Sequence, residues 1–381
     1  MPTTMEPTSE ESSKDRIRKK LAENLRTRRA AVESTAPPGT DPATYVCPWF
    51  GKEKKEVPRE VTGSKLTRLG DVTPYAGDYR NFMIHVYDET LYSDEYRALI
   101  PPIKKFKNYR PNAEVLYQMA YCLETGEQPV MAITGDPSVG KTSITEYFAA
   151  LTRRPWYRFQ HNPRNDVGDL IGVKEVKDGE TRFNTGEITR AIQAPNAILI
   201  HDEGFSMDPG TALCMHGVLE KDGKLMLPEM DGESSSDRYV IPHWNLAHIF
   251  LDNTEGQGDM TGRFVGTQPQ NAALLDRIDM FVKMSFMTVE EEVEALQLYY
   301  PDARTQLLRA CCKVAKLSRS AHKQGTVSTI LSFRVLLQWV KNAIALRDVR
   351  KSLDMCMLNR FSEHTEAQII EGFVDIEFGE M

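Results

Sequence analysis

The sequence has 381 residues, a formal net charge of −7 and 41% apolar residues. A chain of this length and composition can bury a substantial core, which excludes a wholly disordered protein and favours two or three domains. It contains no apolar run near the roughly 18 residues that a membrane-spanning helix needs, and its first residues lack the pattern of a secretion signal. We therefore predict a cytoplasmic protein without membrane attachment.

The cysteines and histidines show no metal-binding pattern. None of the six cysteines stands in a C-x-x-C spacing, and the eight histidines show no ligand spacing. We predict buried thiols rather than a zinc site or a disulfide framework. The cysteines are Cys47, Cys122, Cys214, Cys311, Cys312 and Cys356.

The first 110 residues divide into a tail and a region without a chemical motif. Residues 1–44 are rich in Ser, Thr, Pro and charge, and we predict a disordered or helical basic tail there. Within it, residues 14–29 carry eight basic and two acidic residues. This segment is either an arm that binds nucleic acid or a partner, or a solvated helix that aids solubility. For residues 45–110 we predict a small region of unknown fold.

Alternating helices and strands over residues 111–287 predict an α/β domain. Helices are expected over 113–124 and 141–152, and strands over 130–135, 156–160, 197–203, 246–254 and 281–286. The last three of these strands are compact apolar runs of the kind buried in a parallel sheet, and alternation of helices and strands is typical of an α/β fold.

The pattern becomes all-helical over residues 288–381. A T-x-x-E capping box at Thr288 and Glu291 precedes amphipathic segments near 302–321, 328–347 and 360–372. We therefore predict a second, helical domain after the α/β domain.

A phosphate-binding loop lies between the first of these strands and the next helix. Its sequence fits G-x-x-x-x-G-K-[ST] from Gly135 to Thr142. The loop and the helix N-terminus can face an anion, Lys141 can reach the β- and γ-phosphates, and the Thr142 hydroxyl suits Mg²⁺. We expect ATP and Mg²⁺ as cofactors. The predicted contacts are Gly135, Asp136, Pro137, Ser138, Val139, Gly140, Lys141, Thr142 and Ser143.

Polar residues end two later strands. Asp202 and Glu203 follow an apolar run, at the sheet edge that should lie beside the phosphate loop. Asp202 can hold Mg²⁺ through its water shell, and Glu203 suits the general base that deprotonates the attacking water. Asn253 can donate to that water or to the γ-phosphate; the alternatives are a turn-forming Asn, or Asp252 in this role.

The sequence resembles the AAA+ ATPases of the MoxR type and, within them, the CobS subunit of aerobic cobaltochelatase. The matching strings are GDPSVGKTS (135–143), DLIG (169–172), ILIHDE (198–203), the glycine-rich run 253–278 and LSFRVLLQW (331–339). The resemblance implies a P-loop AAA+ domain with a parallel sheet, followed by an α-helical lid domain. It also implies the cytoplasm of a bacterium, or of the host if a phage encodes the protein.

The resemblance further implies a ring, usually of six subunits, with ATP between adjacent subunits. Arg277 matches the arginine that a neighbouring subunit supplies to the γ-phosphate. The alternative is a helix-surface arginine paired with Asp276 or Asp279. Arg334 matches a second arginine sensor that couples phosphate release to lid rotation, on its own subunit's nucleotide or on its neighbour's.

Two residues depart from CobS-like chains, and two segments match their pore insertions. His201 replaces an apolar residue, and we favour a packed histidine over a catalytic one. Arg263 has no counterpart, and is either a second trans-acting cation or a surface charge. The segments 174–183 and 219–242 read as hairpins that face the ring's pore, or as ordinary surface hairpins.

These residues predict an ATP hydrolase that works as a ring-forming motor and remodels a partner protein. The resemblance implies a partner such as a von Willebrand A-type subunit. Three alternatives stay open: the motor subunit of a cobalt chelatase proper, a nucleic-acid loader or translocase that uses the basic arm, and a nucleotide-gated scaffold. The net charge of −7 weighs against a broad nucleic-acid face. Glu203 and Arg277 weigh against a scaffold without turnover.

Overall fold

The computed structural model describes most of the chain from residue 63 onward. The described ranges are 63–177, 179–221, 223–230, 238–254, 256, 269–361 and 363–379. The predicted tail, its basic arm at 14–29, Cys47 and Arg263 lie outside the described residues, as does part of the predicted hairpin at 219–242.

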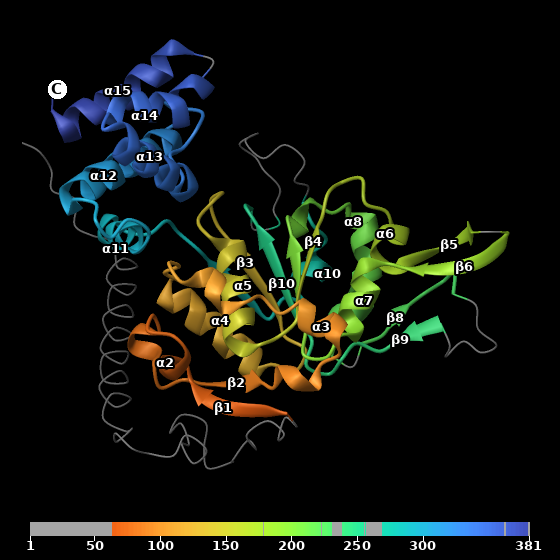
Figure 1. Ribbon diagram of the computed structural model, residues 1–381. Coiled ribbons are helices and arrows are strands. Elements are labelled where there is room, and N and C mark those ends of the chain that lie inside the picture. The colour runs from red at the N-terminus through yellow and green to blue at the C-terminus, as the bar shows by residue number, and fades with distance from the viewer. Residues whose placement is uncertain are drawn as a thin grey trace, which may run out of the picture. The chain divides into compact units, whose positions relative to one another are not determined.

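A five-stranded parallel sheet forms the centre of the α/β part (Figure 1). The strand order is β11-β3-β10-β7-β4. In that order the strands are Met280–Lys283, Val130–Thr134, Ala247–Asp252, Ile198–Asp202 and Trp156–Gln160. Every paired strand is parallel to its neighbour, so the connections are crossovers. The predicted α/β fold with a parallel sheet and a following helical region is confirmed.

Helices cover both faces of this sheet (Figure 1). On one face, α4 (Ala113–Thr125) and α5 (Lys141–Thr152) share a buried cluster with alternate sheet residues such as Ile133 and Ile200. On the other face, α7 (Glu187–Gln193) packs with four shorter helices. These are α6 (Val167–Ile171), α8 (Pro209–Ala212), α9 (His216–Leu219) and α10 (Ala272–Leu275). The side chains of one strand thus enter two cores, because they alternate in direction.

Residues 63–110, which showed no motif in the sequence, pack into the first of these cores. Leu69, Ile84 and Phe106 belong to the same buried cluster as Ile133. The segment contains the antiparallel pair β1 (Ser64–Arg68) and β2 (Met83–Tyr87), and the helices α2 (Leu69–Val72) and α3 (Asp94–Ala98). Between these elements lie 3₁₀ turns at Gly77–Tyr79 and Glu89–Leu91, and a third, Ile103–Phe106, follows α3. No separate core marks the predicted boundary at residue 110.

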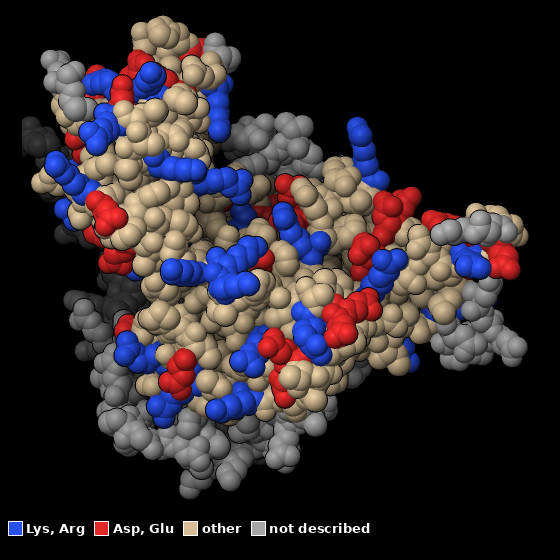
Figure 2. All heavy atoms as spheres, viewed as in Figure 1, with Lys and Arg blue, Asp and Glu red and all other residues tan. Residues whose placement is uncertain are grey.

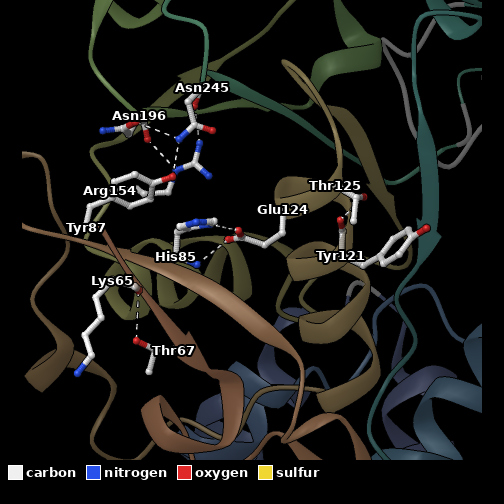
Figure 3. Close-up of polar contacts among 10 residues, drawn as sticks. All are labelled: Lys65, Thr67, His85, Tyr87, Tyr121, Glu124, Thr125, Arg154, Asn196 and Asn245. Carbon is white, nitrogen blue, oxygen red and sulfur yellow. Dashed lines mark hydrogen bonds and ion pairs between the residues drawn. The ribbon is translucent and has the colours of Figure 1, made fainter. Parts of the chain in front are cut away.

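A buried arginine attaches this segment to the sheet (Figure 3). Arg154 is 1% exposed, and its Nε and Nη2 donate to the backbone oxygens of Asn196 and Asn245, each at 2.7 Å. The Asn245 amide donates to the Tyr87 hydroxyl and, at 3.0 Å, to Asn196 Oδ1. A buried charge requires such polar partners. The network therefore links β2 to the residues that precede β7 and β10.

Two hairpins extend from the α/β part. β5 (Gly172–Lys177) pairs antiparallel with β6 (Glu180–Thr185), as the segment 174–183 predicted. β8 (Leu225–Met226) pairs with β9 (Tyr239–Val240) within the predicted hairpin at 219–242.

The C-terminal part is helical and has a core of its own. Its helices are α11 (Val289–Tyr299), α12 (Thr305–Lys323), α13 (Phe333–Leu346), α14 (Val349–Cys356) and α15 (His364–Phe378). The capping box of Thr288 and Glu291 is present at the start of α11. The core runs from Val293 to Val374 around the fully buried Trp339. Helix α14 was not predicted; it is eight residues long, and a short 3₁₀ turn at Leu358–Arg360 follows it closely.

Within the described ranges no helix is both long and apolar enough to cross a membrane. The same residues contain no cluster of His, Cys, Asp and Glu suited to a metal ion. Burial raises the pKa of the Cys122 thiol to about 12. Of the described cysteines, Cys214 is half-buried and the others are buried.

Candidate nucleotide site

The phosphate loop joins β3 to α5 and has a backbone that requires glycine at Gly135. The φ angle of Gly135 is +150°, and a Cβ there would lie 2.1 Å from the backbone oxygen of Met284. The Met284 N–H in turn donates to the Thr134 backbone oxygen at 2.7 Å. This hydrogen bond fixes the position of Met284 and of its backbone oxygen. Gly140 is left-handed and precedes the first residue of α5. The loop therefore packs closely against the end of β11, and a side chain at Gly135 would displace it.

Lys141 is held inside this loop by three acceptors. Its Nζ donates to the backbone oxygens of Gly135 at 2.7 Å and Asp136 at 3.1 Å, and to Asn253 Oδ1 at 2.7 Å. Burial lowers the pKa of Lys141 to about 8, although four nearby carboxylates favour its charged form. These carboxylates are Asp252, Asp202, Asp136 and Glu203. The lysine is thus a cation at neutral pH, at the carboxyl edge of the sheet.

Asp202 and Glu203 follow each other at the end of β7 but face different surroundings. Asp202 Oδ2 accepts a hydrogen bond from Arg158 Nε at 2.7 Å and also contacts Arg158 Nη2. Glu203 is exposed, with a left-handed φ of 54°, and Gln160 Nε2 lies 3.5 Å from its Oε2. The left-handed turn separates the two carboxylates, so that Arg158 pairs with Asp202, whereas Glu203 has only the weaker contact to Gln160 and is exposed to water.

The structure distinguishes Asn253 from Asp252. Asp252 is 3% exposed, and its oxygens accept from the backbone N–H groups of Phe205 at 3.0 Å and Thr254 at 2.8 Å. Asn253, by contrast, directs its side chain to Lys141. Asp252 therefore holds the chain after β10 in place, and Asn253 is the residue that reaches the phosphate loop.

The oxygen atoms near the loop fit a magnesium ion carried by a nucleotide. Mg²⁺ prefers hard oxygen donors and is usually bound by one or two carboxylates together with substrate phosphates. Neither Asp202 Oδ1 nor the Thr142 hydroxyl forms a hydrogen bond with another residue in the described part of the chain. Both atoms are thus available for the ion.

The two predicted arginines, Arg277 and Arg334, form no hydrogen bond or ion pair with the described phosphate loop. Arg277 follows α10; its Nη1 donates to the Ala273 backbone oxygen at 2.6 Å, and its Nη2 forms an ion pair with Glu220. The surface ion pair of the alternative interpretation is present, but its acid is Glu220 rather than Asp276 or Asp279; Asp279 accepts from the Val130 N–H at 2.9 Å. Arg334 is exposed in the first turn of α13 and forms no ion pair within the described part of the chain.

Sequence reasoning missed Arg158 and Gln160, which contact the two acids. Both belong to β4, which carries no recognised motif. One signal was present: Arg158 and Gln160 are two residues apart in a strand, so they share a face of the sheet. Their acidic partners could be assigned only from the pairing of Gln160 with Asp202 across β4 and β7.

His201 is packed, as we favoured, and it has two partners that the sequence did not reveal. Its Nδ1 lies 3.0 Å from His161 Nε2, and its Nε2 lies 3.0 Å from His248 Nδ1. The three rings stack across β7, β10 and the residue after β4, and Phe250 stacks on His201 at 4.3 Å. Burial lowers the pKa of His161 and of His248 to about 3. The histidine chain is therefore neutral at physiological pH.

This histidine chain should make the protein sensitive to acid. Because each folded pKa lies below the ordinary 6.5, the unfolded state binds protons more tightly; stability is complete above about pH 6.5 and falls as the pH drops towards 3. We expect a loss of about 2 kcal/mol for each of His161 and His248 between pH 7.5 and pH 5. Chemical denaturation at the two pH values measures it.

A triple variant and a matched control complete this test. His161→Leu, His201→Leu and His248→Leu together should remove most of the acid sensitivity, whereas the exposed His364→Gln should leave it unchanged. An equal loss of stability in the triple variant would contradict the assignment.

Taken together, a phosphate loop with its lysine, an Asp–Glu pair and an Asn on adjoining strands of this parallel sheet define a P-loop ATPase of the AAA+ class. Residues 131–277 match the AAA domain of the dynein-related subfamily. The chain is 28% identical over 249 residues to the aerobic cobaltochelatase subunit CobS of Sinorhizobium sp. The aligned region covers 63% of this chain and 73% of CobS. The protein is an AAA+ ATP hydrolase similar to CobS, and the predicted resemblance is confirmed.

Other relatives share shorter segments. The putative chaperone BssE of Thauera aromatica is 28% identical over 166 residues, 43% of this chain and 53% of BssE. Lon protease 1 of Syntrophotalea carbinolica is 26% identical over 176 residues, 45% of this chain and 19% of that protease. A solved structure of a RuvB mutant from Thermotoga maritima superposes with a TM-score of 0.44 at 14% identity, covering 74% of this chain and 81% of that one.

Proposed function

We propose that the protein forms a ring, of six subunits in our prediction, and couples ATP hydrolysis at subunit boundaries to the remodelling of a partner protein. The observation that carries the proposal is the grouping at the carboxyl edge of the sheet. There Lys141 contacts Asn253, beside Asp202 and Glu203. Arg277 takes no part in this grouping and pairs with Glu220.

Each residue has a definite task in this proposal. The loop's N–H groups and Lys141 bind the β- and γ-phosphates; when a phosphate takes the lysine's donors, Asn253 is released to orient a water. Glu203 removes a proton from that water. Magnesium, held by Thr142 and Asp202, would supply charge neutralisation at the phosphates.

The contacts of Arg277 support a site completed by a second subunit. Within one chain, its guanidinium contacts Ala273 and Glu220, and no residue of the phosphate loop. Arg277 therefore completes a neighbour's site in the proposed ring, where its positive charge opposes the charge that develops on the γ-phosphate. Arg334 would sense the nucleotide from the helical part.

The partner follows from the similarity to CobS, which is one subunit of a cobaltochelatase. We propose a partner protein such as a von Willebrand A-type subunit, and a cytoplasmic location. The hairpins β5–β6 and β8–β9 are the surfaces proposed to meet that partner in the pore. The motor subunit of a cobalt chelatase proper is the narrower form of this proposal.

A nucleic-acid loader is the second candidate, and it depends on the basic arm at 14–29. On the face in Figure 2, Lys and Arg side chains are interspersed with Asp and Glu rather than gathered in one patch. A loader would bind DNA or RNA with an affinity that falls steeply with salt, because contacts to phosphates release counterions. Binding that does not depend on salt, or that survives deletion of the arm, would exclude it.

The ring is tested by mass and turnover measured together. We expect light scattering to show a larger assembly with ATP and Mg²⁺, and turnover per subunit to rise with protein concentration, because a shared site needs two subunits. The control is Lys141→Ala, because this substitution removes the lysine's contact with the phosphates. The variant protein should not assemble when ATP is added. A protein that stays monomeric with saturating ATP, and hydrolyses it equally fast at every concentration, would contradict the proposal.

A further inference from the structure

Asp202, the acid proposed to hold magnesium, already has a cationic partner in the structure. Arg158 approaches one oxygen of this carboxylate with two nitrogens: Nε donates to Oδ2 at 2.7 Å, and Nη2 contacts the same atom. The Asp202 side chain is 13% exposed, whereas that of Arg158 is 43% exposed. A largely buried carboxylate is thus neutralised by a guanidinium that extends to it from solvent.

The sheet register produces this contact. β4 is the last strand in the order of the described sheet, and Arg158 pairs with Ile200 while Gln160 pairs with Asp202. Arg158 and Asp202 are therefore diagonal neighbours on one face, a separation of about 7–8 Å that a long side chain can span. The Arg158 side chain is 43% exposed and belongs to the last strand of the described sheet, so its head group can leave the carboxylate without unfolding the sheet.

The charges around the phosphate loop indicate what the contact between Arg158 and Asp202 does. Four carboxylates act on Lys141, and a second lysine, Lys323, lies 3.8 Å from one of them, Asp136, so two lysines face four acids. Without a further cation, Asp202 would attract divalent ions even before a nucleotide binds. Arg158 supplies that further cation and occupies one of the two oxygens of Asp202, which leaves Oδ1 for a metal.

We propose that Arg158 is a positioning residue that holds Asp202 as an ion pair in the nucleotide-free site, and so makes metal binding conditional on ATP. The proposal rests on the proposed function, because it takes Asp202 as the magnesium ligand. Arg158 weakens the attraction of Asp202 for a bare divalent ion, whereas the added charge of the phosphates outweighs it when the ion arrives with ATP. An arginine that only fastened β4 to β7 would leave the affinity for metal unchanged.

The test measures metal binding without nucleotide, with Mn²⁺ as the probe. Electron paramagnetic resonance of free Mn²⁺ gives its dissociation constant for the full-length protein. We expect Arg158→Gln to bind Mn²⁺ about tenfold more tightly than the original protein, because a positive charge beside the ligand is gone. Arg158→Lys keeps a positive charge but loses the two-nitrogen contact. The affinity of this variant for Mn²⁺ should therefore lie between that of the original protein and that of Arg158→Gln.

Controls separate this inference from the proposed function. Arg164→Gln removes an exposed arginine from the loop after β4 and should bind Mn²⁺ as the original protein does. Circular dichroism checks that each variant is folded. An Arg158→Gln protein that is folded and binds ATP, but binds Mn²⁺ no more tightly than the original, overturns the role of Arg158 alone. Failure of the original protein to bind ATP would instead overturn the proposed function.

Discussion

Glu203→Gln should abolish most ATP turnover while leaving ATP binding intact. The amide keeps the size of the carboxylate but cannot take a proton from water, and general base catalysis contributes roughly 10²–10⁴-fold to a rate. In the proposed mechanism the phosphate contacts come from the loop and Lys141, whose hydrogen bonds do not involve Glu203. A coupled assay gives kcat, and a fluorescent ATP analogue gives the dissociation constant.

The matched control for this substitution is Glu187→Gln, which changes an exposed glutamate at the start of α7. It should leave both kcat and ATP binding unchanged. If the Glu203→Gln protein kept its full kcat, Glu203 would have no part in the chemistry, and the left-handed turn that exposes it would need another explanation.

Arg277→Ala should cost even more activity. An arginine supplied to the γ-phosphate accelerates phosphoryl transfer by roughly 10³–10⁵-fold in related chemistry. Within its own chain Arg277 forms its hydrogen bond and ion pair with Ala273 and Glu220, outside the phosphate loop, so its removal should not weaken that loop. We expect ATP binding to persist and kcat to fall to the limit of detection.

Mixing two inactive variants then shows from which subunit the arginine comes. Glu203→Gln keeps ATP binding and supplies Arg277 to its neighbour, and Arg277→Ala supplies an intact Glu203 and phosphate loop. If the arginine acts between subunits, random mixing in a ring should restore roughly a quarter of the sites. A mixture that exchanges subunits yet stays inactive would place Arg277 within its own site, or outside the chemistry.

The parts that sequence predicted well are those set by local pattern. The helix after the phosphate loop begins at Lys141 and ends at Thr152, as predicted. The glycine that precedes the helix and the spacing of its apolar residues indicated these bounds. The five strands lie at the segments where the sequence predicted them, and Asp202 ends its strand as predicted. Phosphate loops and strand ends depend on residues a few positions apart, so one sequence is enough to recognise them.

The parts that sequence missed depend on contacts between distant segments. The partners of His201 come from two other segments of the sheet, and Arg158 meets Asp202 across two strands. Strand order and register decide such pairs, and neither can be calculated from local spacing. The fold of residues 63–110 was missed for a related reason, because their apolar residues are buried by helices and strands that follow much later in the chain.

The buried Arg154 has a practical implication for anyone who trims this protein. A shortened chain that starts at residue 111, where the alternating pattern becomes visible, would discard Tyr87, whose ring lies 5.8 Å from the guanidinium carbon. It would also strip the apolar cover from one side of α4 and α5. The catalytic module therefore extends at least back to β1, and any minimal version made for crystallisation should retain the β1–β2 strand pair.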